Sequence, residues 1–166
     1  MELKRVVVTG LGALTPLGNT VQEYWDNLVA GVSGAAPITR FDTTKFKTKF
    51  ACEVKNFDPA QFFDRKEMRK LDPYAQYAIV AADQAIVDSS INAGSVDGNE
   101  VGVLWASGIG GMETFMEEMK GYMKGDCYPR FSPFFVPKLI SDIASGHISI
   151  KYGFRGPNYA TVSACA

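Results

Sequence analysis

The most informative segment of the sequence is its last one, Gly156-Pro157-Asn158-Tyr159-Ala160-Thr161-Val162-Ser163-Ala164-Cys165-Ala166. Residues 159–164 follow a Gly-Pro turn and have the apolar, partly β-branched character of a strand. The small residues that flank Cys165 permit a sharp turn from strand to helix, which would lift the thiol out of the sheet, as a Gly-x-Ser-x-Gly turn does for serine. The segment therefore predicts a strand that delivers a cysteine to the start of a helix.

Strand and helix signals alternate along the remainder of the chain. Residues 4–9 and 100–107 are apolar runs that predict two further buried strands, and residues 45–50 alternate basic and aromatic side chains as an edge strand would. Caps, spacing and proline positions predict helices over residues 20–30, 65–71, 73–90, 112–124 and 138–151. Because strands separated by helical crossovers pair in parallel, residues 1–166 are expected to form an α/β unit with a mostly parallel sheet and helices on both faces.

Composition restricts the class of protein. With 166 residues, 46% of them hydrophobic and 21% charged, and a net charge of -1, the chain can bury a core and is not disordered. It lacks the positive excess of a dedicated nucleic-acid binder, and no apolar run approaches the roughly 20 residues that span a membrane. The N-terminal run of valines is too short for the core of a signal peptide. Three cysteines without metal-ligand spacing predict a reduced, cytoplasmic protein with no metal site.

Positive charge is concentrated in residues 40–70, which hold nine basic and five acidic side chains although the whole chain is nearly neutral. A basic surface on a neutral protein favours an acidic partner. A chance cluster on a solvated surface would give the same composition. Basic residues between aromatic ones can also stack nucleic-acid bases, but nothing else in the chain supports that interpretation.

Two glycine-rich turns have some features of cofactor sites. Gly10-Leu11-Gly12 follows a predicted strand, but Thr15 occupies the position of the third glycine of a dinucleotide fingerprint, and Pro16 separates the turn from the next helix. Gly108-Ile109-Gly110-Gly111 lacks the Gly-Lys-Ser/Thr that completes a phosphate-binding loop, so it indicates a tight turn from strand to helix. No cofactor is therefore expected.

The histidine and the methionines favour structural roles. His147 is the only histidine and lies among apolar residues of a predicted helix, which favours a structural side chain over a catalytic base. Met112, Met116, Met119 and Met123 follow helical spacing and are expected to pack in the core. Cys127 is assigned no role.

Cys165 is the strongest candidate for chemistry. A thiol at a helix N-terminus feels the helix dipole and the unpaired N–H groups, which favour the thiolate. The same N–H groups could stabilise the oxyanion that forms when the sulfur attacks a thioester. Taken by itself, the pattern leaves open an inert, buried cysteine, because buried cysteines are common.

Residues 156–166 resemble the nucleophile segment of the β-ketoacyl-acyl-carrier-protein synthases. Three further stretches agree in order with that family: Arg5-Val6-Val7-Val8-Thr9-Gly10-Leu11-Gly12 with Thr15-Pro16-Leu17-Gly18, Ser107-Gly108-Ile109-Gly110-Gly111, and Ser132-Pro133-Phe134-Phe135-Val136-Pro137. The resemblance covers essentially the whole chain. The turn containing Ile109 is most similar to that of the type II members, which serve dissociated bacterial fatty-acid synthesis.

The resemblance implies the amino-terminal half of a thiolase-like fold in a homodimer, because family chains are more than twice as long. The carboxy-terminal half, with the family's two catalytic histidines and a lysine, is expected after Ala166, and His147 matches neither histidine. The piece of 166 residues is therefore expected to be inactive by itself.

The activity implied by the resemblance is a decarboxylative condensation without cofactor or metal. The Cys165 thiolate takes an acyl group from acyl carrier protein, and the carbanion formed from malonyl carrier protein attacks that thioester and extends the chain by two carbons. Ile109 and Phe134 would line the acyl pocket, Phe134 reaching in from the dimer partner, although both could simply pack in a core. The positions that match carrier-protein contacts are Lys66, Arg69, Lys70 and Arg130.

Two other hypotheses remain within the family. The protein could be a polyketide or aryl-polyene ketosynthase, or a non-catalytic partner subunit. Such partner subunits usually lack the nucleophile, so the presence of Cys165 favours an active enzyme.

Overall fold

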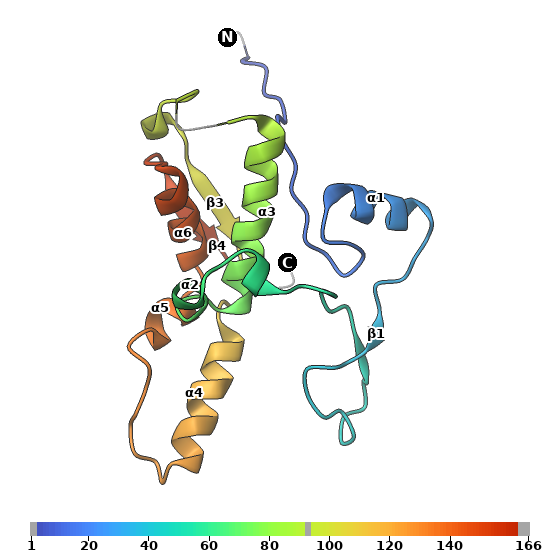
Figure 1. Ribbon diagram of the computed structural model, residues 1–166, viewed down its shortest axis with the longest axis vertical. Helices are drawn as coiled ribbons and strands as arrows, with labels where there is room; N and C mark the ends of the chain where they lie inside the picture. The colour runs from blue at the N-terminus through green and yellow to red at the C-terminus, as the bar shows by residue number, and fades with distance from the viewer. Residues whose placement is uncertain (1–2, 92–93, 163–166) are drawn as a thin grey trace. The chain divides into compact units, whose positions relative to one another are not determined.

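The computed structural model describes residues 3–91 and 94–162 (Figure 1). The chain forms two compact units, one of Met1–Asp58 with Asp83–Ser90 and the other of Pro59–Ala82 with Ile91–Ala166. The long helix α3 (Pro73–Ser89) contributes its first part to the second unit and its last turns to the first. Each unit is described separately below.

The first unit contains α1 (Val21–Val29) and a small antiparallel pair, β1 (Ala36–Pro37) with β2 (Phe50–Ala51). The hydroxyl of Thr20 accepts a hydrogen bond from the backbone amide of Glu23 at 3.2 Å, which caps α1. A cap of this kind is a local signal, and the helix predicted over residues 20–30 is confirmed.

The polar residues of α3 hold the loop before α1. The amide of Leu11 donates to the Asp88 carboxylate at 2.8 Å, and the amide of Ala13 donates to the Gln84 side chain at 3.1 Å. Gln84 in turn donates to the carbonyl of Asn19 at 2.7 Å. The polar stripe of this helix therefore satisfies the backbone of a loop that has no regular structure of its own.

Two strands predicted for the first unit were wrong. Residues 4–9 form no strand and are exposed, Val6 to 90%. A strand needs a hydrogen-bonded neighbour, and in the described part of the chain this run pairs with none. In residues 45–50 only Phe50 belongs to a strand, because Asp42 accepts hydrogen bonds from Thr44 and bends the chain into a turn before that run begins.

The second unit is built around one parallel strand pair, β3 (Val103–Ala106) and β4 (Asn158–Thr161), in register from Val103 opposite Asn158 to Ala106 opposite Thr161. The short turn η2 (Gly98–Glu100) leads into β3. Helix α6 (Ile143–Tyr152) packs along both strands, as Figure 1 shows. The parallel pairing and the α/β class predicted from the sequence are confirmed.

The start of β4 is tied to α6 by side chains. The Asn158 amide donates to the Ser145 carbonyl at 3.0 Å and to the Ser149 hydroxyl, and its oxygen accepts from the Ser145 hydroxyl at 2.9 Å. Ser145 is fully buried. Around this network lie the apolar core residues, which come mainly from α3, α6 and β3: Phe63, Leu71, Ala75, Ala78, Ile79, Val80, Val103, Ala144, Ile148 and Phe154.

Helix α2 (Arg65–Met68) follows the turn η1 (Pro59–Gln61) and begins with a complete capping box. The Asp64 carboxylate accepts from the amides of Lys66 and Glu67 at 2.6 and 2.8 Å, and the Glu67 carboxylate accepts from the Asp64 amide at 3.0 Å. The predicted start of this helix is confirmed, while its end falls at Met68 rather than residue 71.

Helices α4 (Met112–Lys124) and α5 (Phe135–Leu139) complete the second unit. The range predicted for α4 is confirmed. The helix predicted over residues 138–151 was wrong as one element, because the chain is extended at Ile140 and divides it into α5 and α6.

The predicted core packing of the α4 methionines was also wrong for three of the four, and Met119 is half-buried. Met112, Met116 and Met123 are exposed, whereas the buried residue of this helix is Thr114. The aromatic rings of Phe115, Phe131 and Phe135 stack beside the helix, with centroid separations of 6.3 Å for Phe115 and Phe135 and 5.4 Å for Phe131 and Phe135. These rings leave Met112, Met116 and Met123 exposed. The helical spacing of the methionines correctly indicated an apolar face of α4, but it could not indicate which residues, if any, pack against that face.

Candidate active site

The predicted nucleophile, Cys165, lies outside the described residues, the last of which is Val162. Strand β4 ends at Thr161, four positions before Cys165 in the sequence. The geometry of the candidate site is therefore that of the elements surrounding the end of β4.

The ends of β3 and β4 meet at one edge of the sheet. The two strands are parallel, and just beyond β3 the amide of Ser107 donates to the carbonyl of Thr161 at 3.3 Å. In parallel sheets the carboxyl ends of adjacent strands carry the loops that form sites. The turn after β3, Gly108 to Gly111, thus begins at the same edge from which the chain continues toward Cys165.

The turn at this edge is held by backbone contacts that only glycine allows. Gly110 has a φ of 90°, and its amide donates to the Ser107 hydroxyl at 2.9 Å. The amide of Gly111 donates to the Leu139 carbonyl at 2.9 Å, and a Cβ on Gly111 would lie 2.1 Å from the Lys138 carbonyl oxygen. The turn therefore sits directly against the end of α5, and a side chain at either glycine would push it away.

Both predicted pocket residues lie on these touching segments. Ile109 is in the turn, with 66% of its surface exposed, and Phe134 immediately precedes α5, with 37% exposed. The Phe134 amide donates to the Ser132 hydroxyl at 3.2 Å, and Ser132 donates its own amide to the Glu118 carboxylate of α4. Neither side chain is buried among the described residues, and their placement in the acyl pocket stays a prediction.

Three of the four predicted carrier-protein residues are on or next to α2. Lys66 lies in the helix, Arg69 caps its C-terminal end and Lys70 follows, and all three are exposed. The capping box at Asp64 fixes the start of this short helix, so the three charges project from a defined backbone.

Arg130, the fourth, lies on the loop between α4 and α5. Its guanidinium carbon lies 5.0 Å from the centre of the Tyr128 ring, a cation–π contact. Arg130 and Tyr128 line a hollow of about 250 Å³ together with Glu117 and Glu118.

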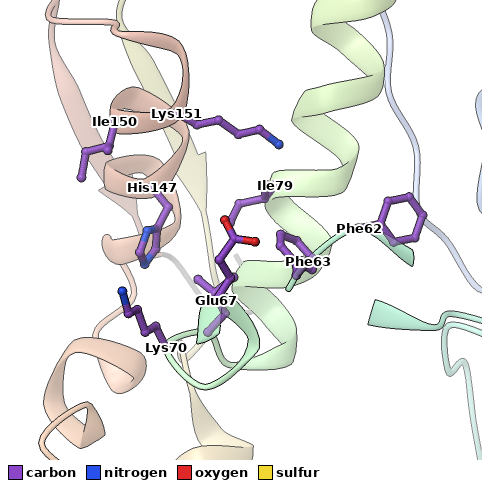
Figure 2. A pocket seen from close by; sticks show the side chains of 9 residues that line it. Phe62, Phe63, Glu67, Lys70, Ile79, His147, Ile150 and Lys151 are labelled. Carbon is purple, nitrogen blue, oxygen red and sulfur yellow. The ribbon is translucent and has the colours of Figure 1, made fainter. Parts of the chain in front are cut away.

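A larger pocket of about 290 Å³ lies between α2 and α6 and was not predicted from the sequence (Figure 2). Its apolar lining includes Phe63, Leu71 and Ile79, and its polar lining consists of Glu67, Lys70, His147 and Lys151. The pocket joins helices that are far apart in the sequence. The sequence signals close to it were the basic cluster of residues 40–70 and His147, and neither indicated a pocket.

His147 faces this pocket, as Figure 2 shows. Partial burial lowers the pKa of its imidazole below the usual 6.5, and the nearby positive charge of Lys70 lowers that pKa further. Both effects favour the neutral ring. His147 is half-buried, and its predicted structural role, in preference to that of a catalytic base, stays a prediction.

The described residues offer neither a metal site nor a membrane span. Within residues 3–91 and 94–162, no three His, Cys, Asp or Glu side chains are grouped so that they could hold a metal ion. In the same residues, no helix combines the length and the apolar character needed to cross a bilayer.

Comparison with solved structures defines the class of fold. The structure titled the ishigamide ketosynthase/chain length factor matches 96% of this chain and 40% of its own with a TM-score of 0.87 at 26% sequence identity. The α/β unit, with its glycine turn beside the strand that leads to a cysteine, is therefore that of the thiolase-like ketosynthases.

Sequence comparison gives the family. Residues 3–166 match the model of the beta-ketoacyl synthase N-terminal domain, and the chain belongs to this family. It is 45% identical over 166 residues to 3-oxoacyl-[acyl-carrier-protein] synthase 2 of Synechocystis sp. (strain ATCC 27184 / PCC 6803 / Kazusa), covering 100% of this chain and 40% of that protein. It is 49% identical over 164 residues to the Staphylococcus aureus (strain COL) protein of the same name, covering 98% of this chain and 39% of the relative. The chain thus spans about two fifths of the length of these relatives.

Proposed function

We propose that the whole protein is a 3-oxoacyl-acyl-carrier-protein synthase of fatty-acid synthesis that elongates acyl chains by two carbons through a thioester on Cys165. The observation that carries this proposal is the hydrogen bond from Ser107 to Thr161, which ties the Ile109 turn to the strand preceding Cys165. The names of the relatives support the choice of fatty-acyl over polyketide or aryl-polyene substrates. The retained cysteine argues against a non-catalytic partner subunit.

The chemistry assigned to Cys165 is nucleophilic catalysis. Its thiolate attacks the carbonyl of an acyl thioester, and the carrier thiol leaves as the acyl-enzyme bond forms. A malonyl thioester then loses carbon dioxide, and the resulting carbanion attacks the acyl-enzyme carbonyl and expels the Cys165 thiolate. Backbone N–H groups at a helix start would stabilise both the thiolate and the tetrahedral oxyanion.

Ile109 and Phe134 are proposed to line the acyl pocket. The support is that both apolar side chains are partly exposed and lie on segments in direct backbone contact. Within the homodimer that we expect, Phe134 would enter the pocket of the partner subunit. The exposed methionine face of α4 and the neighbouring aromatic residues provide apolar surface for such an interface.

The partner that delivers the substrate is proposed to be an acidic acyl carrier protein. Lys66, Arg69 and Lys70 would meet it on α2, with Arg130 as a further contact, because exposed basic side chains attract an acidic surface and speed the encounter. The carrier protein in the names of the relatives supports this choice. We expect the protein to act in the cytoplasm, without metal or cofactor.

The proposal is tested with the full-length protein and acyl carrier substrate. We expect one acyl group to be added to Cys165, detected by mass spectrometry of the peptide, and Cys165→Ala to abolish condensation while retaining the native circular dichroism spectrum. Cys127→Ala is the matched control, because Cys127 is an exposed free thiol of the same unit, and it should behave as the unmodified protein. Condensation at the normal rate by Cys165→Ala would disprove the assignment. The isolated piece of 166 residues is expected to show no turnover.

A further inference from the structure

Asp72 is a buried carboxylate that the proposed chemistry does not use. Only 3% of its surface is exposed, and it immediately precedes α3. Its carbonyl accepts from the amide of Gln76 at 3.1 Å, and its carboxylate accepts from the amide of Tyr74 at 3.3 Å, so it caps its own helix. A buried carboxylate is costly unless its oxygens are hydrogen-bonded, so the partners of the second oxygen indicate its further role.

The second carboxylate oxygen of Asp72 binds a different helix. It accepts from the backbone amide of Thr114 at 2.8 Å and from the Thr114 hydroxyl at 2.7 Å. Thr114 is the third residue of α4 and is itself 3% exposed. The amides of a first helical turn have no partner within the helix, and an acceptor at the position before the helix normally satisfies one of them.

Helix α4 cannot supply that acceptor itself. The residue before it is Gly111, which has no side chain and makes no cap hydrogen bond. Gly111 cannot be exchanged for serine or aspartate in this backbone, since any Cβ would meet the Lys138 carbonyl oxygen at 2.1 Å. Asp72 therefore caps α4 from a distant point in the sequence, and its negative charge suits the positive end of the helix dipole.

The anchored helix start is also the end of the turn that carries Ile109. That turn is fixed on its strand side by the bond from Ser107 to Thr161 and at its last residue by the bond from Gly111 to Leu139. Ile109 stands three positions before Met112, the first residue of α4. Loss of the Asp72 contact would release the first turn of α4, so that the helix side of the turn would be held by the Gly111 bond without the support of Thr114, and Ile109 could shift.

We propose that Asp72 is a positioning residue for acyl-chain selection: its carboxylate caps α4 and thereby fixes Ile109, which sets how long a chain the pocket accepts. The inference rests on the proposed function, because it takes Ile109 as part of the acyl pocket. Asp72 also follows Lys70 by two positions, so the same short segment joins the proposed carrier contact to the turn.

The test uses full-length protein carrying Asp72→Asn, Thr114→Val or Thr114→Ser. The rate at which Cys165 is acylated is measured with a short and a long saturated acyl chain on the same carrier protein. We expect the long-to-short ratio to change by about tenfold in Asp72→Asn, the lower end of the discrimination that a hydrophobic pocket gains or loses when its size changes by about one methylene group. Thr114→Val should change the ratio in the same direction by a smaller factor, and Thr114→Ser, which keeps the hydroxyl, should restore the original ratio.

A loss of stability alone would not move this ratio. Ser145→Ala is the matched control, since it also removes a hydrogen-bonding group from a fully buried residue of the same unit, away from the turn. It should lower the melting temperature and leave the ratio unchanged. If Asp72→Asn does not fold, Thr114→Val provides the same test. That variant keeps Asp72 and its bond to the Thr114 amide, and removes only the hydroxyl that donates to the carboxylate. Hydrogen exchange of the amides of residues 110–115 should accelerate in Asp72→Asn but not in Ser145→Ala.

The outcomes separate the two proposals. If unmodified protein is acylated and the ratio stays the same in Asp72→Asn, or moves equally in Ser145→Ala, the inference is overturned while the proposed function stands. If unmodified protein takes up neither acyl group, the proposed function fails and the inference fails with it. A changed ratio with faster exchange, restored in Thr114→Ser, supports Asp72 as the positioning residue.

Discussion

The amide of Ser107 and the carbonyl of Thr161 are joined by a hydrogen bond of 3.3 Å at the point where both parallel strands end. Ile109 is two residues beyond the first group, and Cys165 is four residues beyond the second. One backbone contact therefore brings together two segments that are more than fifty positions apart in the sequence. The turn that carries Ile109 and the segment that precedes Cys165 therefore leave the sheet at the same edge. The function proposed above relies on this arrangement.

The glycine turn should tolerate no side chain at Gly111. In Gly111→Ala the new Cβ would lie 2.1 Å from the Lys138 carbonyl oxygen, and both groups belong to backbone that cannot move freely. We expect the free energy of unfolding of the full-length protein to fall by at least about 1 kcal/mol, measured with urea. Gly121→Ala is the control: Gly121 lies inside α4, where a Cβ meets nothing within 4 Å, and alanine should raise stability by up to about 1 kcal/mol. Equal effects of the two substitutions would contradict the turn geometry.

The capping box of α2 should be necessary for carrier binding. Asp64→Ala removes the acceptor of the Lys66 and Glu67 amides, so we expect a loss of about 1 kcal/mol in stability together with weaker carrier binding, since Lys66 would no longer be held on an ordered helix. Unfolding in urea and titration calorimetry with the carrier protein measure the two effects. Asp64→Ser keeps a capping oxygen and should retain both properties. Carrier affinity unchanged in Asp64→Ala would remove α2 from the proposed interface.

Charge reversal on α2 should affect the encounter with the carrier protein and not the chemistry. In Lys66→Glu and Lys70→Glu we expect the KM for carrier-linked substrate to rise by about fivefold at low salt for each lysine, because exposed ion pairs are weak individually. The difference from unmodified protein should shrink as salt is added. Acylation by a small thioester without carrier should be unaffected. Lys4→Glu, another exposed lysine, serves as the charge control, and an equal rise in KM there would show a non-specific effect.

Stability should fall below neutral pH because of His147. Burial, and then the charge of Lys70, lower the pKa of the folded imidazole below 6.5, so the unfolded chain binds the proton more readily. The contribution of His147 is fully present above pH 6.5 and is lost as the pH falls through the lower pKa of the folded state. Urea unfolding between about pH 7.5 and about pH 5 should show this loss, and His147→Asn should reduce it.

Lys70 provides the control for this titration. The charged groups that line the pocket around His147 are Glu67, Lys70 and Lys151. In Lys70→Met one of the two causes of the lowered pKa is removed, so the pH dependence should become shallower. An imidazole that titrates at its ordinary pKa in NMR spectra of the full-length protein would contradict the environment described for it.

Local signals were sufficient for the starts of α1 and α2, but not for those of α5 and α6. Thr20 and Asp64 accept hydrogen bonds from amides two or three residues ahead, so the sequence contains both partners, and these starts are confirmed. The α/β class followed from the alternation of apolar runs. The valines of residues 4–9 show the limit, because a strand depends on a neighbour that local sequence does not specify.

Non-local contacts could not be predicted from one sequence. Asp72 lies directly before the proline that begins a predicted helix, but its bond to Thr114 crosses 42 positions, and nothing in the local sequence pairs the two residues. The pocket at His147 likewise combines residues of α2, α3 and α6. The predicted role of Cys165 stays a prediction, since that residue lies outside the described range.

The bonds between Asn158 and the serines of α6 have a further consequence for β4. Successive side chains of a strand emerge on opposite faces of the sheet, so shifting the strand by one position would exchange the sides taken by Tyr159 and Ala160. The Asn158 side chain holds the first residue of the strand against α6. It therefore determines the face of the sheet to which each following side chain points, up to Thr161. A slipped strand would have to break three side-chain hydrogen bonds at once. Asn158 therefore fixes the register of β4 against β3, and with it the orientation of the side chains of residues 159–161.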